Sequence, residues 1–193
     1  MGTLGFESDR SQEDAVKVRL EPFTRGDFAR LTGWVNSPEA LAEWAGKFFS
    51  FPLDEPQLER YVADAGGEHP VRRIYRAVDA STGEVLGHAE LSHIWPHLSG
   101  RLSRILIGRP AHRGHGLGAQ LVRQLLQESF AAYGFHRLDL GVLESNAAGL
   151  RCYEKCGFQR VGLWPGAFTV GERELSVCWM TCFRADWERL RTD

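Results

Sequence analysis

The chain has 193 residues, of which 43% are hydrophobic and 25% are charged, and its formal net charge is -2. This length and composition are typical of one globular domain, and the near-neutral charge argues against nucleic acid or an anionic membrane surface as a partner. No apolar run approaches the roughly 20 residues that span a bilayer, and the first residues lack the basic and apolar regions of a signal peptide. We therefore expect a cytoplasmic protein with a flexible tail at 1–15 and a single domain at 16–193.

Apolar periodicity and turn residues predict short strands and helices along the first half of the chain. The segment 44–53, WAGKFFSFPL, places aromatic residues around a glycine and a proline, which predicts a loop with an apolar underside. The turn Ser81-Thr82-Gly83 joins two strands into a hairpin. In chain order we expect a strand at 16–20, helices at 27–35, 37–44 and 56–65, and strands at 74–79 and 85–94.

The second half contains the strongest helical pattern of the chain, at 117–132, where Leu117, Leu121 and Leu125 share one face. A loop is expected at 164–168. The other predicted elements are strands at 102–107, 138–142, 158–162 and 174–183 and a helix at 146–155 that ends before Gly157. We expect all of these elements to belong to one sheet with helices packed on it.

Three glycines lie between the strand at 102–107 and the helix at 117–132, in the run Arg113-Gly114-His115-Gly116-Leu117-Gly118. Glycine has no Cβ, so main-chain N–H groups can close around a ligand, and the first turn of a helix offers unpaired donors at its positive end. Arg113 adds a permanent cation whose planar donors suit phosphate oxygens. The run therefore predicts a pyrophosphate site.

The same glycines also fit a dinucleotide-binding fingerprint, which would make the protein an NAD-dependent oxidoreductase. Gly114, Gly116 and Ala119 match its spacing, and Asp139 follows about 20 residues later. Against this alternative, several strands precede the glycines, and Asp139 lies inside a predicted strand rather than at its carboxyl end. We regard the oxidoreductase as a remote alternative.

The four cysteines, Cys152, Cys156, Cys178 and Cys182, form two pairs that are each spaced by four residues. Four such ligands would suit zinc, but structural zinc sites usually hold their cysteines in tight turns. These pairs instead fall on a predicted helix and a predicted strand, where free cysteine packs as a small hydrophobic residue. We expect no metal.

Two motifs at this separation resemble those of the GNAT superfamily of N-acetyltransferases. The pattern RxxGxG from Arg113 to Gly118 resembles the acetyl-CoA signature, and NAAGLRCYEKCGF from Asn146 to Phe158 resembles the motif that follows it. The segment that leads into the second motif, LDLGVLESN, most resembles the corresponding segment in the branch that includes ribosomal-protein N-terminal acetyltransferases. The resemblance covers nearly the whole chain and implies an α/β (α+β) fold with a mixed, mostly antiparallel sheet, splayed at the cofactor site and flanked by helices.

The resemblance also implies acetyl-CoA as the co-substrate. Its pantetheine arm would bond to main chain near Leu106, Ile107 and Gly108, although Gly108 replaces the apolar residue that is usual there. A strand that has lost its neighbour exposes N–H and C=O groups, so the amides of pantetheine can add to it like another strand. The residues expected to contact the cofactor are Leu106, Ile107, Gly108, Arg113, Gly114, His115, Gly116, Leu117, Gly118 and Asn146.

Acetyl transfer to an amine requires loss of a proton from the ammonium and gain of a proton by the leaving thiolate. Tyr153 matches the general acid of the family, and Asn146 is both a cofactor contact and a candidate N-cap. Glu90 is the first candidate for the base, acting through water, with Glu144 or water alone as the alternatives. Cys152 precedes Tyr153 and points elsewhere on the helix, so we expect direct attack in a ternary complex.

The acceptor is expected to be a small-molecule or peptide amine. It would enter a pocket walled by aromatic side chains, for which the candidates are Trp44, Phe48, Phe49, Phe51, Trp164 and Phe168. The main alternative function is an acyl-CoA-binding sensor without useful turnover. The strand around Trp179 is the candidate edge for pairing in a homodimer.

Overall fold

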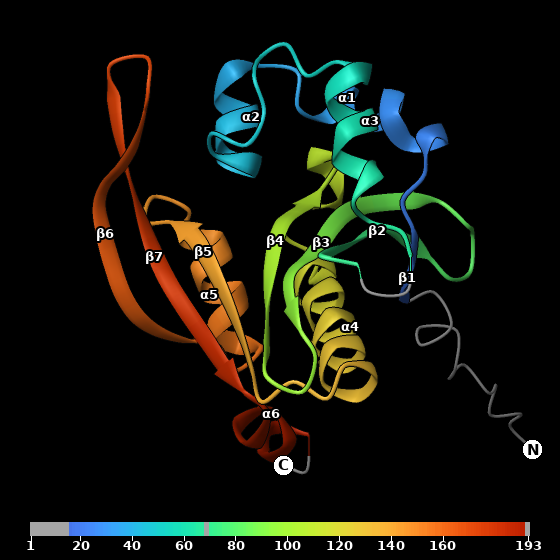
Figure 1. Cartoon of the computed structure of the whole chain (residues 1–193), viewed down its shortest axis with the longest axis vertical. Coiled ribbons are helices and arrows are strands. Elements are labelled where there is room, and N and C mark those ends of the chain that lie inside the picture. The colour runs from blue at the N-terminus through green and yellow to red at the C-terminus, as the bar shows by residue number, and fades with distance from the viewer. Residues whose placement is uncertain (1–15, 68–69, 192–193) are drawn as a thin grey trace, which may run out of the picture.

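The strands of the computed structural model form one sheet in the order β1-β2-β3-β4-β5-β7-β6 (Figure 1). The structure describes residues 16–67 and 70–191, so the predicted tail at 1–15 lies outside the described residues. Neighbouring strands are antiparallel except β4 and β5, which are parallel. The strands are β1 (Val18–Pro22), β2 (Arg72–Asp79), β3 (Val85–Trp95), β4 (Ser99–Ile107), β5 (Arg137–Leu143), β6 (Gln159–Val170) and β7 (Arg173–Phe183).

Helices cover both faces of the sheet. In Figure 1, α1 to α3 gather on one side, whereas α4 and α5 lie behind the strands. None of the helices among the described residues is long and apolar enough to cross a membrane. The helices are η1 (Arg25–Asp27), α1 (Phe28–Trp34), α2 (Pro38–Ala45), α3 (Glu55–Ala63), η2 (Pro110–His112), α4 (Leu117–Ala132), α5 (Ala147–Lys155) and α6 (Arg184–Leu190).

Local sequence accounts for where these helices begin. The Ser37 side chain accepts a hydrogen bond from the backbone N–H of Ala40, and the Asp54 side chain accepts one from Gln57, so both are N-caps. Helix α4 begins at the predicted residue, directly after Gly116, whose φ of 80° is one that glycine adopts without steric cost. These caps satisfy backbone donors that would otherwise be unpaired.

The sheet separates two apolar cores. Leu121 and Leu125 of α4 are fully buried in one core, together with Leu138 of β5 and Met180 of β7. The other core lies under α1 to α3 and includes Leu58. Three cysteines, Cys156, Cys178 and Cys182, are buried in the first core, as expected of cysteine that packs as a hydrophobic residue.

The sheet opens between β4 and β5. These strands pair only from Ser99 to Arg101 of β4, whereas β4 stays paired with β3 as far as Ile107. A bulge opposite Ala89 shifts the register of β4 by one residue and holds Arg104 at φ 48°. The edge of β4 that faces β5 is therefore unpaired beyond Arg101 within the described residues, and the predicted splay is confirmed.

Two predictions about the end of the chain were wrong. The strand expected at 158–162 continues to Val170 as β6, and the loop expected at 164–168 belongs to it. Pro165 and Gly166 suggest a turn, but the register with β7 only shifts there and then resumes.

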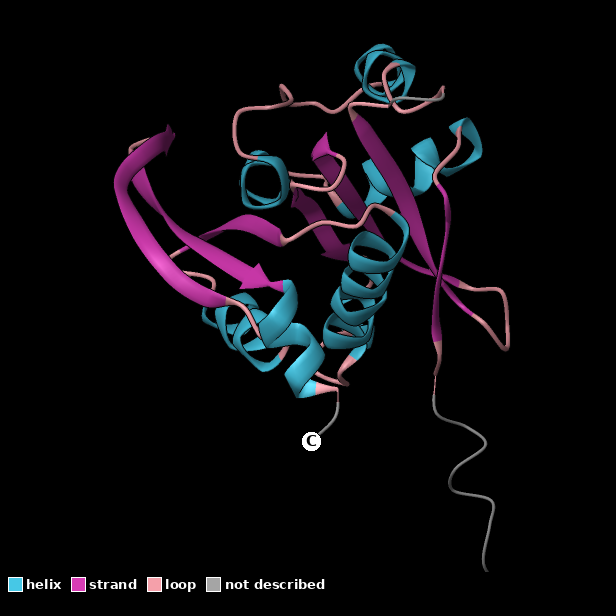
Figure 2. Ribbon diagram, turned by 60° about the horizontal axis from the view of Figure 1, so that its bottom comes forward, coloured by secondary structure: helices cyan, strands magenta, loops and turns pink. Residues whose placement is uncertain are grey.

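Helix α6 was not predicted because its main apolar anchor is Trp187, which packs on Phe130 with ring centroids 5.1 Å apart. Figure 2 shows the curved β6–β7 pair at one edge of the sheet.

Candidate active site

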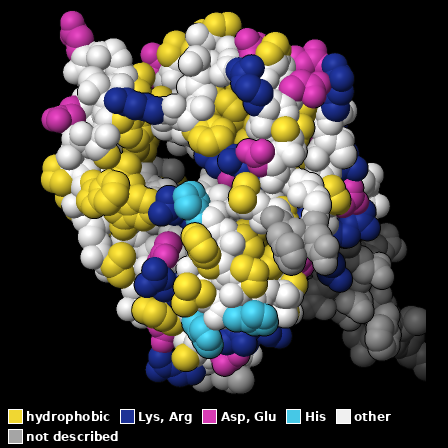
Figure 3. Space-filling model, in the orientation of Figure 1, with side chains coloured by type: hydrophobic (Ala, Val, Ile, Leu, Met, Phe, Trp, Pro, Cys, Tyr) yellow, Lys and Arg dark blue, Asp and Glu magenta, His cyan; other side chains and the backbone are white. Residues whose placement is uncertain are grey.

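A cavity of about 350 Å³ lies where β4 and β5 separate, and it is also lined by α2 and the β6–β7 pair. In the space-filling view the surface is hollowed between the β6–β7 pair and the rest of the molecule (Figure 3). The polar or aromatic side chains of its lining include Glu43, Trp44, Arg101, Ser103, Arg104, Asn146, Tyr153, Phe168 and Trp179. Of the residues predicted from the sequence as catalytic, Tyr153 lines this cavity and Glu90 does not.

Tyr153 reaches the cavity from α5. Its side chain is half-buried, and its ring meets Phe158 edge-on with centroids 6.0 Å apart. Burial raises the pKa of Tyr153, so the phenol keeps its proton at neutral pH. A protonated phenol next to the open cavity has the form that a proton donor needs.

Asn146 caps α5 at the edge of the same cavity. Its side-chain oxygen accepts a hydrogen bond of 2.8 Å from the backbone N–H of Gly149, so the N-cap interpretation is confirmed. The two N–H donors of the side-chain amide remain for another partner. The capping role and a cofactor contact are therefore compatible.

The glycine run connects η2 to α4 and contains two glycines in the left-handed region. Gly114 and Gly116 have φ of 84° and 80°, and a Cβ on either would meet no atom within 4 Å. Their conformation, rather than tight packing, therefore calls for glycine, and open space lies above them. The first turn of α4 follows directly, and its N–H groups include donors without an intrahelical partner.

Arg113 joins this loop to the end of β4. Its guanidinium donates to the carbonyl oxygens of Ile107 and Gly108, at 3.1 Å and 3.3 Å. A guanidinium has five N–H donors, so three remain for an anion. Of the neighbouring histidines, His112 lies 4.0 Å from Glu84, and His115 is exposed.

The end of β4 explains the unusual glycine at 108. A Cβ on Gly108 would lie 2.1 Å from the Trp34 indole, so any larger residue would displace the ring. The backbone N–H of Gly108 donates to Leu86 on β3. Leu106 packs into the core under α1 to α3 and Ile107 into the core of α4, which fixes this end of the strand.

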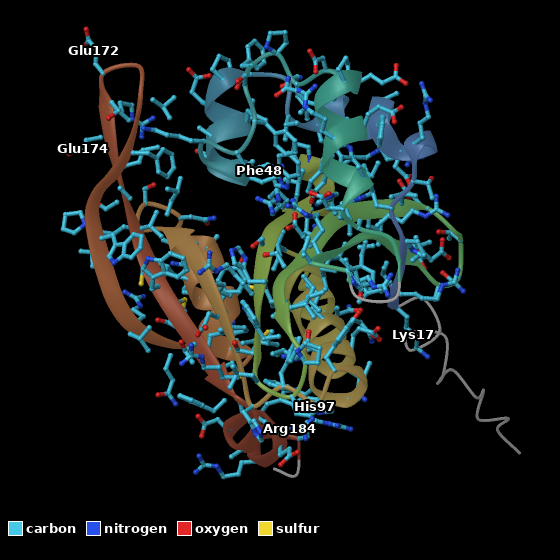
Figure 4. The ribbon with its side chains drawn as sticks, in the orientation of Figure 1. Lys17, Phe48, His97, Glu172, Glu174 and Arg184 are labelled. Atoms are coloured by element: carbon cyan, nitrogen blue, oxygen red, sulfur yellow. The ribbon has the colours of Figure 1, made fainter. Side chains whose placement is uncertain are left out.

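Glu90 lies in a sealed polar cluster on the other side of Arg104. Its side chain is fully buried, both of its oxygens accept hydrogen bonds from the Arg104 guanidinium, and one also accepts a hydrogen bond from the Tyr61 hydroxyl. The ring of Phe48, which lies between the helices and the β3–β4 strands in Figure 4, covers the Arg104 guanidinium at 4.1 Å. This position does not favour Glu90 as a base, because its oxygens are engaged and do not face the cavity.

Burial decides the charge states in this cluster. Burial opposes the positive charge of Arg104, but the hydrogen bonds to Glu90 raise the pKa of its guanidinium. Burial raises the pKa of Tyr61 and lowers that of His88 to about 4, so both are neutral at pH 7. The cluster thus holds Glu90 between two guanidinium groups, those of Arg104 and of Arg72, which lies 3.8 Å away, together with two neutral rings.

Two side chains that no sequence motif connects with β4 hold its bulge in place. The carbonyl oxygen of Arg104 accepts a hydrogen bond from the Trp44 indole N–H and lies within hydrogen-bonding distance of His88 Nδ1, both at 2.8 Å. Trp44 comes from α2 and His88 from β3, far apart in the chain. Their hydrogen bonds stabilise the left-handed conformation of Arg104, which a residue with a side chain adopts at some cost.

Two other carboxylates bear on the choice of base. Glu144 is exposed, and its backbone N–H donates to Ser176 on β7, but it is not among the residues that line the cavity. Glu43 on α2 is exposed and lines the cavity. No motif or spacing in the sequence pointed to Glu43, because its position depends on how α2 packs against β4.

Cys152 faces away from the cavity. It lies near the first turn of α4, where a Cβ on Gly118 would be 3.6 Å from its sulfur. A hydrogen bond from Cys156 lowers the pKa of the Cys152 thiol to about 7. Because Cys152 is not part of the cavity lining, the geometry agrees with direct attack rather than a covalent cysteine intermediate.

The predicted aromatic wall is only partly present. Trp44 and Phe168 line the cavity, whereas Phe49 stacks on Trp44 behind it and Trp164 meets Trp179 edge-on at 5.2 Å. Phe48 and Phe51 are 47% and 46% exposed and lie outside the lining. The cavity therefore has fewer apolar and more polar side chains than the sequence suggested.

The oxidoreductase alternative does not fit this fold. Asp139 lies inside β5, where its carboxylate accepts hydrogen bonds from Thr181 and Arg137. A dinucleotide-binding unit needs a parallel sheet with the acidic residue at the carboxyl end of a strand. Here the strands are mostly antiparallel, and the carboxylate is already engaged.

Comparison with known proteins gives a consistent result. The family model for the acetyltransferase (GNAT) family matches residues 38–158. The chain is 26% identical over 204 residues to aminoglycoside N(6')-acetyltransferase type 1 from Klebsiella pneumoniae, which covers 100% of this chain and 94% of that protein. It is also 33% identical over 91 residues to L-methionine sulfoximine/L-methionine sulfone acetyltransferase from Pseudomonas paraeruginosa, covering 46% of this chain and 52% of that protein.

Among solved structures, the fold is similar to spermidine N-acetyltransferase from Vibrio cholerae in complex with CoA and spermine. The TM-score is 0.76 at 25% sequence identity, and the match covers 89% of this chain and 98% of the other. These relatives are named for small-molecule acceptors. The narrower resemblance to ribosomal-protein acetyltransferases therefore stays a prediction.

Proposed function

Because the chain belongs to the GNAT acetyltransferase family, we propose that its cavity binds a small-molecule amine and that Tyr153 assists transfer of an acetyl group to it. The chain is an acetyl-CoA-dependent N-acetyltransferase, as its family and its similarity to aminoglycoside and spermidine N-acetyltransferases indicate. The opening of the sheet beside Tyr153 is the observation that carries the proposal, because it brings the unpaired edge of β4 and the phenol to one cavity.

The residues around the splay fit the two ends of acetyl-CoA. The edge of β4 that β5 leaves unpaired runs towards Leu106 and Ile107 and offers main-chain groups to the amides of pantetheine, with the Ile107 carbonyl already bonded to Arg113. Gly114, Gly116 and the first turn of α4 offer N–H donors to the pyrophosphate, and Arg113 contributes the donors that it does not use on β4. Bound acetyl-CoA supplies a thioester, which accepts the amine at its carbonyl carbon and releases the thiol.

We assign the role of proton donor to Tyr153. It lines the cavity, and its raised pKa keeps the phenol protonated at the pH of the reaction. A general acid of this kind contributes roughly 10²- to 10⁴-fold to a reaction rate. Asn146 supports the arrangement because its cap fixes the first turn of the helix that carries Tyr153.

Water is the proposed route by which the ammonium loses its proton. Glu90 is engaged with Arg104 and Tyr61, so we assign it to holding β4 in place rather than to proton transfer. Glu43 is the one carboxylate among the described lining residues and is accessible to solvent. A water molecule at the mouth of the cavity can therefore pass the proton to bulk solvent or to Glu43.

The proposed acceptor is a small molecule, since the relatives named above are named for such amines. A peptide N-terminus, which the narrower resemblance implies, is the second class to be tested. The cytoplasmic location and the homodimer stay predictions from the sequence.

The test is calorimetric titration of the purified protein with acetyl-CoA and, separately, with NAD, followed by an amine panel assayed for release of free thiol. We expect acetyl-CoA to bind, NAD not to bind, and at least one amine to release thiol with formation of the acetylated amine. Binding of acetyl-CoA without thiol release would favour the sensor alternative. Binding of NAD alone would refute the proposal.

A further inference from the structure

The cavity has a charge balance that does not suit a polycation. Among its described lining residues the charged side chains are Glu43, Arg101 and Arg104. Arg104 is neutralised by Glu90, so Glu43 at the mouth and Arg101 on β4 remain. The acidic Glu172 and Glu174 lie on the β6–β7 pair, away from the cavity (Figure 4), and are not lining residues. An acceptor with several positive charges would find one carboxylate here and meet a guanidinium.

Arg101 is a cation without a counter-ion. Its carboxylate neighbour in the sheet register is Asp139, but that side chain is engaged with Arg137 and Thr181. No side-chain hydrogen bond or ion pair joins Arg101 to another described residue, and its Nε is buried without a partner. Its guanidinium lies 4.7 Å from the centre of the Trp179 ring. The buried Nε therefore has no hydrogen-bond acceptor, which is costly, and the terminal nitrogens are not among the buried unpartnered atoms.

Trp179 adds a second unmatched donor next to the first. Its indole Nε1–H is buried without a partner among the described residues, and its ring lines the cavity from β7. Gly141 on β5 lies beside this ring, because a Cβ there would be in ordinary contact with the indole at 3.5 Å and in tight contact with Val177 at 3.0 Å. Two neighbouring side chains that line one cavity therefore each have a buried donor without a partner among the described residues.

We propose that the acceptor amine carries a carboxylate and that Arg101 and Trp179 bind this carboxylate. A planar guanidinium matches a carboxylate with two parallel hydrogen bonds, and the indole N–H can donate to the same group. The exposed carboxylate of Glu43, which also lines the cavity, can pair with the ammonium group of such an acceptor. The inference rests on the proposed function, since it specifies which amines the acetyltransferase uses.

The experiment compares acceptors that differ only in this group. We would measure kcat/KM by thiol release for a panel of L-amino acids and for the carboxamide of each, with spermidine and kanamycin as polycationic acceptors. At least one amino acid is expected to exceed its own carboxamide ten-fold or more. Short peptides in a further arm distinguish a free amino acid from a peptide as the source of the carboxylate.

Variants identify the residues. Arg101→Met should remove the preference by raising the KM for the amino acid ten-fold or more, with kcat/KM for the carboxamide and KM for acetyl-CoA within two-fold of wild type. Trp179→Phe, which keeps the ring and removes the N–H, should have a smaller effect in the same direction and serves if Arg101→Met does not fold. Arg160→Met is the matched control, because Arg160 is exposed on β6 and pairs with Glu154.

The outcomes separate this inference from the proposed function. Acetylation of carboxamides or of polycations at least as fast as amino acids would overturn the inference and leave the acetyltransferase intact. An amino-acid preference that survives in both variants would also overturn it. Thiol release with none of these amines would count against the proposed function itself.

Discussion

Two polar regions meet at the β4 strand, where Arg104 belongs to both, and they differ in how their charged side chains are paired. On one side, the Glu90 carboxylate accepts hydrogen bonds from Arg104 and Tyr61 and lies 3.8 Å from Arg72, so that its own charge is paired. On the other, Arg101 and Trp179 leave donors unmatched beside a cavity that also contains Tyr153. A buried polar group whose hydrogen-bond partners are all within the protein has a structural role. A buried polar group without such a partner is a candidate for binding a ligand. The more suggestive carboxylate in the sequence, Glu90, lies on the structural side.

The largest expected effect tests the structural side. Glu90→Ala should lower the free energy of unfolding by about 3–5 kcal/mol, because it leaves the Arg104 charge buried without its partner. Chemical denaturation monitored by circular dichroism measures this change. Glu144→Ala, which removes an exposed carboxylate, is the matched control and should change the free energy of unfolding by less than about 0.5 kcal/mol. Unchanged stability with abolished turnover would restore Glu90 as the base.

The next effect tests the cavity side. Tyr153→Phe should lower kcat about 100-fold with little change in acetyl-CoA affinity, because it removes a proton donor and keeps the ring in place. Steady-state kinetics and calorimetry measure the two quantities. Tyr133→Phe is the control, since the Tyr133 hydroxyl accepts a hydrogen bond from Arg73 outside the cavity. Wild-type turnover in Tyr153→Phe would remove this phenol from the mechanism.

The smallest expected effect concerns the cofactor loop. Arg113→Ala should weaken acetyl-CoA binding roughly ten-fold, as the loss of one exposed charge-assisted contact would, and leave kcat at saturating acetyl-CoA nearly unchanged. The contact should weaken further as salt is added. Arg109→Ala, which removes an exposed cation from the same loop, is the control. Equal affinity in the two variants would mean that the pyrophosphate lies elsewhere.

Elements set by local pattern were predicted well. Helix α4 has the bounds 117–132 that its apolar spacing indicated, and the hairpin of β2 and β3 turns at the expected residues, where the Asp79 side chain accepts a hydrogen bond from the Ser81 N–H. The errors fall where long-range pairing overrides local signals. β6 continues through Pro165 and Gly166 because β7 pairs with it on both sides of the irregularity.

The site was predicted in part for the same reason. The glycine run and Tyr153 belong to contiguous motifs, so their positions on a loop and a helix followed from the sequence. Glu90 could be placed on its strand but not in its environment, because Arg104 and Tyr61 are 14 and 29 residues away. Arg101, Trp179 and Glu43 carried no signal at all, since they come from three different elements.

The sequence by itself determined the family, the order of the elements, the capped helix starts and the glycine loop, because caps, turns and periodicity are decided by residues a few positions apart. Tertiary structure alone decided which carboxylate is buried, why residue 108 must be glycine, and which side chains line the cavity. Packing brings these groups together across the sheet, and desolvation then fixes their charge and availability, so neither can be derived from the neighbours in the chain.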